Sequence, residues 1–483
     1  STPSSNRRQR QMCIRDSVIS GNSGRNIQLN GLDAAGNTVQ GNFIGTDATG
    51  TVALENGRAI LIQDAPDNTI GGTEAGARNV ISGNRPGISI EGATATGNVI
   101  QGNYIGVDVT GSAPLGNRGA TIRFTTGASN NTVGGTEPEA GNIIANSSWV
   151  GISLFPDAGT GNRILSNAIF DNAGMGIEIN RDGVTPNDEG DADTGPNNFQ
   201  NHPVIATSVA ANGGAAVRAT LSSTPSSAFT LDFFSNDVCD ETGFGEGRYP
   251  LGTASLTTDA TGWGSVTTAL SGVTGTVLTA TATDAEGSTS EFSECLAVST
   301  LGISSTPSTQ TVTQGQSAVY TVSVTAQGGP FEETLDLSCS GNPAGTACTF
   351  DQDQVTLVSG QASATMTVTT VAPAASAPLG TDGSPWGPPV VWVYTLLALA
   401  ALLAYSAASR LTPTNPAGAV GGRLGRPLVR GTLVAGLLSI PVSCGDDGTK
   451  PPTGGTPPGS YELTVSATWE TVQLTTTATM VVQ

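Results

Sequence analysis

The sequence predicts an all-β chain: a right-handed parallel β-helix followed by two β-sandwiches, the second interrupted by a transmembrane helical hairpin. Three observations predict this architecture. Segments of the first 150 residues recur at a period of about 62 residues. The 64 glycines and the 12% of charged residues favour many tight turns over long charged helices. One stretch of 20 residues, 390–409, has no charged side chain and is long enough to span a bilayer.

The repeat defines the first element. GNTVQGNFIGTDATG, from Gly36, recurs as GNVIQGNYIGVDVTG from Gly97, and NTIGGTE from Asn68 recurs as NTVGGTE from Asn131. Echoes 19 or 20 residues apart predict that each long unit holds three turns of roughly 20 residues. Short alternating segments such as GIEI, residues 176–179, are typical of strands.

Asparagine recurs beside these strands at the expected corners. Stacked asparagines can form ladders of side-chain amides, and asparagine tolerates the left-handed conformation that a corner needs. We assign this structural role to Asn42, Asn84, Asn103, Asn167 and Asn172.

The pattern N-x-I-x-G-N-x-I-G-x-D-x-T-G, with N-T-I-G-G-T, resembles bacterial right-handed parallel β-helix repeat surface proteins of the pectate-lyase-like superfold. The resemblance covers residues 17–204. It implies the fold but no single activity, because the fold hosts lyases, hydrolases, epimerases, adhesins and scaffolds.

Residues 1–16 differ from the rest of the chain. They hold four of the 19 basic residues and lack an apolar signal-peptide core, and MCIRDS resembles adapter-derived sequence. We interpret them as a non-native or disordered segment and expect further turns upstream of residue 17.

Residues 181–204 are expected to cap the end of the β-helix, since a solenoid must cover its last turn. The carboxylates of this segment allow two interpretations. They could supply oxygen ligands to Ca²⁺, or they could form a solvated acidic cap. The candidate ligands are Asp182, Asp188, Asp191 and Asp193.

Two sandwiches follow, at 205–300 and at 305–372 completed by 458–483. They resemble the immunoglobulin-like modules that follow such helices in bacterial surface proteins. Cys239 with Cys295, and Cys339 with Cys348, are the candidate disulfides, and they indicate an oxidising compartment.

A membrane hairpin at 388–445 is expected as an insertion in the second sandwich. Its first span is 390–409, and 431–443 is a shorter candidate for the second. Four arginines between these spans indicate a cytoplasmic loop, which places both flanks outside. They are Arg410, Arg423, Arg426 and Arg430.

Charge and histidine content exclude several functions. The net charge of −20 argues against nucleic-acid binding. His202 is the only histidine, which excludes a zinc site built on several histidines. No catalytic residue or organic cofactor is expected.

Two carboxylate arrangements were candidates for an active site. Asp47 and Asp108 occupy equivalent places in the repeat, but three turns would separate them by roughly 14 Å, too far for a hydrolase pair. Arg123 could act as a lyase base with acidic residues of nearby turns, although nothing in the sequence brings them together. Those residues are Asp64, Asp67 and Glu91.

We therefore expect a non-catalytic, membrane-anchored, monomeric scaffold or adhesin at the cell surface or in the periplasm, which binds polysaccharide or another cell-surface ligand. The alternative is a polysaccharide lyase or glycoside hydrolase whose site lies in missing turns or in a groove that the sequence does not reveal.

Overall fold

The computed structural model describes residues 13–211, 213–374 and 454–483, and nearly all regular structure in these residues is β-strand. The single helical element among them is the 3₁₀ turn η1 (Pro196–Phe199). No helix in the described ranges is long and apolar enough to cross a membrane. The predicted hairpin at 388–445 lies entirely outside these ranges, which end at 374 and resume at 454.

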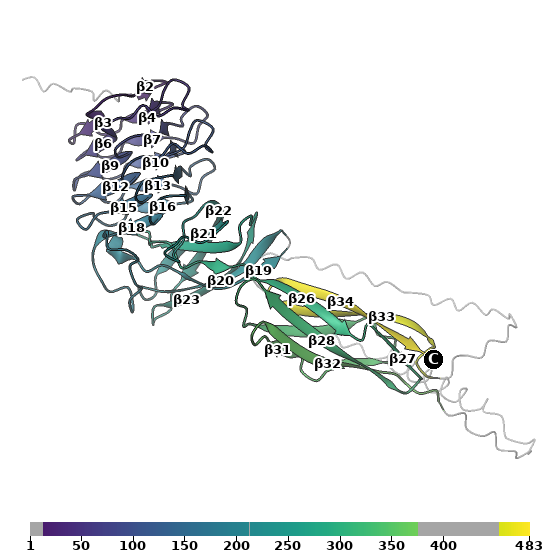
Figure 1. The fold of residues 1–483 in the computed structure, drawn as a ribbon. Coiled ribbons are helices and arrows are strands. Elements are labelled where there is room, and N and C mark those ends of the chain that lie inside the picture. The colour runs from purple at the N-terminus through teal and green to yellow at the C-terminus, as the bar shows by residue number, and fades with distance from the viewer. Residues whose placement is uncertain (1–12, 212, 375–453) are drawn as a thin grey trace, which may run out of the picture. The chain divides into compact units, whose positions relative to one another are not determined.

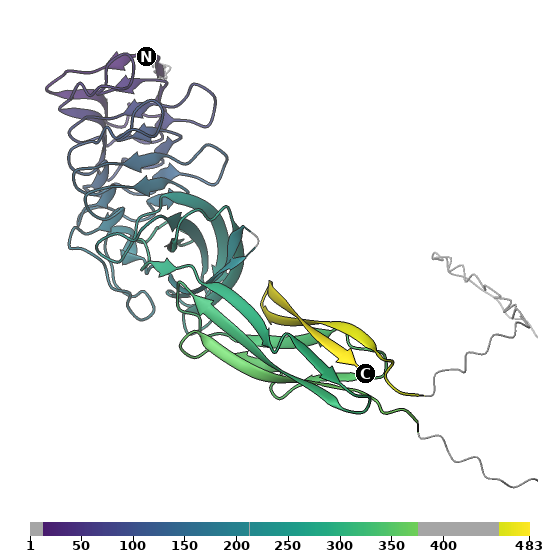
Figure 2. The same ribbon diagram turned by 45° about the vertical axis from the view of Figure 1, so that its right-hand side comes forward.

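Residues 13–179 form three parallel sheets of six strands each, built from stacked rungs of the chain, as expected for an all-β fold (Figures 1 and 2). Each rung contributes one short strand to each sheet. Sheet A contains β1 (Cys13–Arg15), β4 (Thr38–Gln40), β7 (Thr69–Gly71), β10 (Val99–Gln101), β13 (Thr132–Gly134) and β16 (Arg163–Leu165). Sheet B contains β2 (Val18–Ile19), β5 (Phe43–Ile44), β8 (Val80–Ile81), β11 (Tyr104–Ile105), β14 (Ile143–Ala145) and β17 (Ala168–Phe170). Sheet C contains β3 (Arg25–Asn30), β6 (Arg58–Gln63), β9 (Ile88–Glu91), β12 (Ile122–Thr125), β15 (Ile152–Leu154) and β18 (Ile177–Ile179).

The predicted turn length is wrong. Consecutive strands of sheet A begin 25, 31, 30, 33 and 31 residues apart, so the 62-residue period spans two turns rather than three. The 19-residue echo joins different sheets: Val80 opens β8 in sheet B, and Val99 opens β10 in sheet A. An asparagine precedes the strand in both sheets, so strands of two sheets within one turn looked like strands of successive turns.

Apolar side chains fill the coil in vertical columns. Ile60, Ile88, Ile122, Ile152 and Ile177 are register partners on successive rungs of sheet C, and each is almost fully buried. Burying each side chain contributes about 1.5–3 kcal/mol. The β-branched isoleucine suits this pleated, close-packed position.

Residues 13–15 form β1, which belongs to the first rung and pairs with β4 of the second. The fold therefore includes part of the stretch that the sequence set apart as non-native. Residues 1–12 are outside the described ranges.

The first sandwich has one sheet of three antiparallel strands and one of four. The first sheet contains β19 (Val204–Ala211), β20 (Gly214–Ser222) and β23 (Trp263–Ser271). The second contains β22 (Tyr249–Thr257), β21 (Ala228–Asn236), β24 (Val277–Thr283) and β25 (Leu296–Ala297). Buried residues of both sheets, among them Val217, Leu231 and Phe233, form its core.

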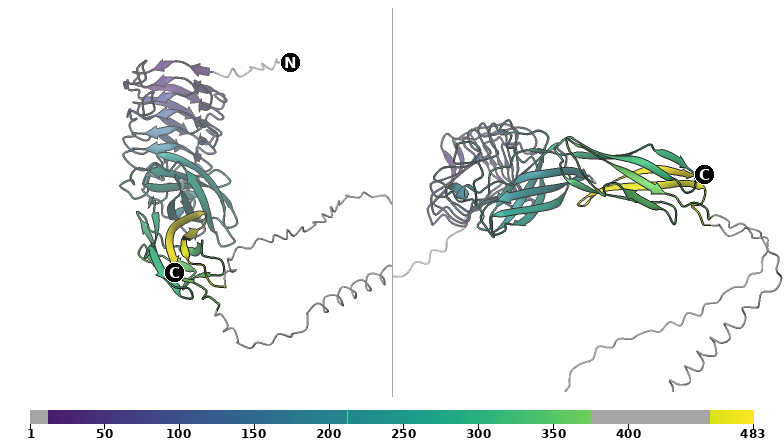
Figure 3. Two further views of the ribbon diagram at one scale, coloured as in Figure 1. Left: turned by 90° about the vertical axis from the view of Figure 1, so that its right-hand side faces the viewer. Right: turned by 90° about the horizontal axis from the view of Figure 1, so that it is seen from below.

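The second sandwich is assembled from two parts of the sequence. One sheet contains β26 (Thr300–Thr306), β28 (Ser317–Gln327), β32 (Gln361–Thr369) and β30 (Ala347–Phe350). The other contains β27 (Thr309–Val312), β34 (Val472–Val482), β33 (Gly459–Trp469), β29 (Thr334–Ser340) and β31 (Gln354–Thr356). The C-terminal hairpin β33–β34, yellow in Figure 3, lies between β27 and β29. Val371 and Thr456 exchange hydrogen bonds where the intervening segment leaves and re-enters this sandwich.

Candidate functional site

Buried asparagines connect neighbouring rungs of the β-helix. At the entrance to sheet B, the side-chain amide of each asparagine donates to the side-chain oxygen of the next at 2.8–3.0 Å. Asn42, Asn103 and Asn167 belong to this ladder, as the sequence suggested, together with Asn79 and Asn142. Asn84 belongs to another ladder, between sheets B and C, where it receives from Asn56 and donates to Asn117.

A third ladder was missed by the sequence analysis. It precedes sheet A, and its donor–acceptor distances are 2.9–3.1 Å. Its members were visible in the N-T-I and N-T-V motifs, but the wrong turn length hid their alignment. They are Asn37, Asn68, Asn98, Asn131 and Asn162.

Asp47 and Asp108 each organise their own loop. Asp47 accepts hydrogen bonds from the Thr49 hydroxyl and from the backbone of Thr51 and Val52. Asp108 does the same with Thr110 and its loop, and these bonds hold the pKa of both carboxyls below the ordinary value. With two turns between them the separation is about 10 Å rather than 14 Å. The lowered pKa values, rather than the distance, make Asp47 and Asp108 a poor hydrolase pair, because a general acid needs a raised pKa.

Three of the four candidate calcium ligands lie together. Carboxylate oxygens of Asp188, Asp191 and Asp193 are all within 4.8 Å of one another, whereas Asp182 bonds to Asn180 instead. Burial raises the pKa of Asp191 to about 6. Asp188 Oδ1 is buried and without a hydrogen-bond partner in the described structure, which suits a cation. Both Asp191 oxygens, however, accept bonds from Asn201 and Ser223. These three residues could hold Ca²⁺ only with further oxygens, since the ion takes six to eight.

Side chains of the first sandwich cover the last rung of the β-helix. Asp232 accepts from the Ser166 N–H, Glu246 from Asn172 at 2.8 Å, and Glu291 from the Ile179 N–H at 2.7 Å. Phe234 and Phe292 join the apolar core of the coil. The predicted cap, 181–204, contributes Asn197, whose side-chain oxygen accepts from the Asn162 N–H at 3.0 Å. Asn172, predicted as a ladder residue, therefore donates its side-chain amide to the Glu246 carboxylate instead of to another asparagine.

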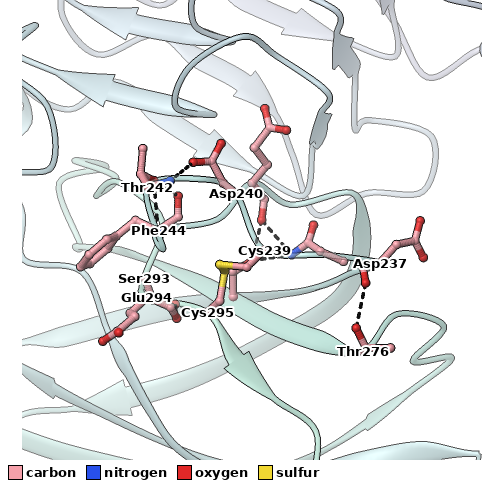
Figure 4. Close-up of a disulfide and its surroundings, with 12 residues drawn as sticks. Asp237, Cys239, Asp240, Thr242, Phe244, Thr276, Ser293, Glu294 and Cys295 are labelled. Carbon is pink, nitrogen blue, oxygen red and sulfur yellow. Dashed lines mark hydrogen bonds between the residues drawn. A yellow bond between two sulfur atoms is a disulfide. The ribbon is translucent and has the colours of Figure 1, made fainter.

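Both candidate cysteine pairs are joined. Cys239–Cys295 ties the loop after β21 to the segment before β25, and Cys339–Cys348 lies within the second sandwich. Around the first disulfide, Thr242 N–H donates to Asp240 and the Thr276 hydroxyl donates to the Asp237 carbonyl (Figure 4). His202 packs edge-on against Phe244 next to this disulfide, and burial lowers its pKa. A buried histidine of this kind has little access to a substrate.

An open hollow of about 540 Å³ lies at sheet C and is lined by four of the eight arginines of residues 17–204. Four arginines and two aromatic rings line it, and no carboxylate is among its lining residues. These side chains are Arg85, Arg118, Arg123, Arg181, Trp149 and Phe155. The guanidinium of Arg181 lies over Trp149, 4.8 Å from the ring centroid, and over Phe155 at 4.5 Å.

Ion pairs orient the arginines of the hollow. Glu91 bridges Arg58 at 2.9 Å and Arg123 at 2.7 Å. Glu55 pairs with Arg85 and lies 3.7 Å from Arg118 in a looser, more exposed ion pair. Arg123 also donates to Ser89, its register partner on the adjacent rung, which fixes the position of its guanidinium over the sheet.

The proposed lyase constellation is not assembled around Arg123. Glu91 pairs with it, but among the described residues Asp64, Asp67 and Glu91 do not form a group of metal-ligating oxygens. Asp64 receives a bond from Thr94. Within the described residues, the Asp188 cluster is the one group of three metal-ligating side chains, and it lies in the cap segment.

Comparisons with known proteins do not assign a family. No family model matches the sequence, and no curated protein matches it. Among solved structures, the chain is similar to the crystal structure of a protein of unknown function from Porphyromonas gingivalis W83. That match has 12% identity and a TM-score of 0.10, and it covers 35% of this chain and 80% of the other.

Proposed function

We propose that the protein is a non-catalytic, membrane-anchored scaffold or adhesin outside the cytoplasm, and that its β-helix binds a polysaccharide at the hollow of sheet C. The observation that carries the proposal is the lining of this hollow. Aromatic faces pack against sugar rings, and arginine forks bind the oxygens of sugars and their substituents.

The scaffold supports binding without chemistry. The buried asparagine ladders and apolar columns fix the backbone of sheet C, so the lining side chains are held on a rigid surface. Two disulfides support an oxidising location, and the uncharged stretch 390–409 supports a membrane anchor. We expect the chain to act as a monomer.

The alternative is a polysaccharide lyase or hydrolase. The pair Asp47 and Asp108 gives it no support, because both carboxylates accept hydrogen bonds from their own loops. Glu178 and Glu291 have raised pKa values because of burial, but both oxygens of Glu291 accept backbone N–H groups and its side chain is buried. The described residues therefore favour binding over catalysis.

The test uses the full chain in detergent micelles with a panel of acidic and neutral polysaccharides, with and without Ca²⁺. We expect binding to at least one polysaccharide and no release of unsaturated or reducing ends. Trp149→Ala should weaken binding at least tenfold, while Trp263→Ala, which removes an exposed tryptophan from the first sandwich, should not change it. Release of sugar ends would overturn the non-catalytic proposal.

The membrane topology has its own test. A reporter enzyme fused after Arg426 is expected on the cytoplasmic side, because the four arginines favour that side. A reporter that is active outside the cell would contradict the hairpin.

A further inference from the structure

The arginines of the β-helix are not spread over its surface. Between residues 17 and 380 the chain has 33 acidic side chains, no lysine and ten arginines. Six of these arginines lie on or beside sheet C, and we call them the arginine face. They are Arg25, Arg58, Arg85, Arg118, Arg123 and Arg181.

These arginines follow the stack of rungs in order. Arg25 and Arg58 open β3 and β6 and are register partners. Arg85 and Arg118 come just before β9 and β12, and the backbone of Arg118 hydrogen-bonds to the rung of Asn84, next to Arg85. Each of the first four rungs therefore presents an arginine near the entrance to sheet C.

The fifth and sixth rungs complete the series. Trp149 precedes β15 and Phe155 follows it, and Arg181 follows β18. The contacts of Arg181 with both rings hold its guanidinium at this end of the face. Because adjacent rungs are about 4.8 Å apart, the face from Arg25 to Arg181 is about 24 Å long.

Positive charge exceeds negative charge along this line. Four of the six guanidinium groups pair with only two carboxylates, Glu55 and Glu91. A third carboxylate, Glu178 of β18, lies in the register column of Arg123 and is buried. Burial and the neighbouring charge of Arg123 lower the pKa of Arg58, as expected for a crowded cationic surface.

We infer that the arginine face binds one extended polyanionic glycan, which lies along the stack of rungs and places its carboxylate or sulfate groups against successive arginines. This inference rests on the proposed function and specifies its ligand. Rung spacing is close to the length of one sugar residue in an extended chain, so an acidic chain can meet an arginine on each of the first four rungs and on the sixth, with the aromatic rings of the fifth rung between them. A nucleic-acid duplex is a poorer partner, because it is wide enough to meet the acidic faces as well.

The test measures binding of the full chain in detergent micelles by isothermal titration calorimetry. The ligands are a polyuronate, a sulfated dextran, unmodified dextran and single-stranded DNA. We expect both acidic glycans, or one of them, to bind at least tenfold more tightly than unmodified dextran, and the stronger of the two identifies the anion. Affinity should fall as salt rises, because arginine contacts to anions are screened.

Variants locate the site. Arg85→Ala with Arg118→Ala should lower the affinity for the acidic glycan at least tenfold. The control Arg78→Ala removes an arginine from the loop beside Glu139, away from sheet C, and should change affinity less than twofold. Arg123→Lys keeps the charge but loses the planar fork, so it should bind more weakly than the wild type. Circular dichroism melting checks that each variant is folded.

Ligand length tests the direction of binding. Affinity should rise with oligosaccharide length until the chain covers the six rungs, and then level off. A plateau at the disaccharide would overturn the axial arrangement. Equal affinity for unmodified dextran, tighter binding of single-stranded DNA, or no effect of the double variant would overturn this inference.

The two proposals can fail separately. If neutral glycans bind, and binding depends on Trp149 but not on the arginines, the proposed function stands and the polyanionic ligand is refuted. Absence of binding to every glycan overturns both.

Discussion

Substitution of Asn103 by alanine tests whether the ladders stabilise the β-helix. Asn103 is fully buried, and its amide donates to the carbonyls of Ile70 and Gln101 and to Asn142. Its side-chain oxygen accepts from the amide and the backbone N–H of Asn79, at 2.9 and 3.3 Å. Alanine removes all of these bonds at once and leaves no room for bulk water to replace them.

The expected cost follows from these contacts. Each hydrogen bond that is lost contributes about 1 kcal/mol net, and each buried group left without a partner costs about 1–3 kcal/mol. The Asn79 amide and the Asn142 oxygen keep other partners, so the sum is about 3–5 kcal/mol. That is a large part of the 5–15 kcal/mol that typically stabilises a domain.

The assay must separate the β-helix from the sandwiches. Hydrogen–deuterium exchange across a urea series, read by mass spectrometry on peptides from 98–145, reports the opening of the affected rungs. Asn30→Ala is the control, because Asn30 is exposed at the end of β3. A loss below about 1 kcal/mol for Asn103→Ala, or an equal loss for Asn30→Ala, would refute the ladder argument.

Three further predictions concern the parts around the β-helix. Cys239→Ser with Cys295→Ser should destabilise the first sandwich by about 4 kcal/mol, because the disulfide closes a loop with a sequence separation of 56, and calorimetry with and without reductant should show no such shift in the double variant. Burial raises the pKa of Glu291 to about 8 and those of Asp232 and Glu246 to about 7, so the folded state keeps protons that the unfolded chain releases near pH 4. The stability that these protonated groups contribute is fully present below about pH 4 and is lost by about pH 7–8. Between about pH 4 and pH 8 the urea midpoint should therefore fall less steeply in Glu291→Gln than in the wild type. If Asp188, Asp191 and Asp193 hold calcium, Ca²⁺ should raise the melting temperature of the wild type but not that of the double variant Asp188→Asn with Asp193→Asn. Equal shifts in both proteins would show that these residues only accept hydrogen bonds in the cap.

The architecture could be predicted because repetition exposes it. Identical motifs at a fixed offset require identical local structure, and alternating apolar residues define strands without any knowledge of their partners. The turn length could not be read in the same way. Asn79 and Asn98 have the same local chemistry but open strands in different sheets, and only the pairing of β8 with β5 and of β10 with β7 separates them.

The arginine face could not be predicted for a related reason. Arg25 and Arg181 are far apart in sequence, and the six arginines follow no fixed period because the rungs differ in length. Arg123 drew attention as a strand arginine, but its neighbours Arg58 and Glu91 come from the two preceding rungs. A surface built from one residue per rung becomes visible only when the register is known.

The end of the β-helix shows why the first sandwich follows it directly. A column of parallel strands leaves a row of N–H groups without partners at its last rung, and each such buried group is costly. In the described structure, side chains from the sandwich accept these N–H groups at all three sheets: Asp232 beside sheet A, Glu246 beside sheet B and Glu291 beside sheet C. Two phenylalanines of the same module cover the apolar core. The acidic segment 181–204 therefore shares the capping role with the sandwich, and its carboxylates bond partly to that module through Ser223. Because each acceptor belongs to a different part of the sandwich, the last rung is completed only when that module is folded.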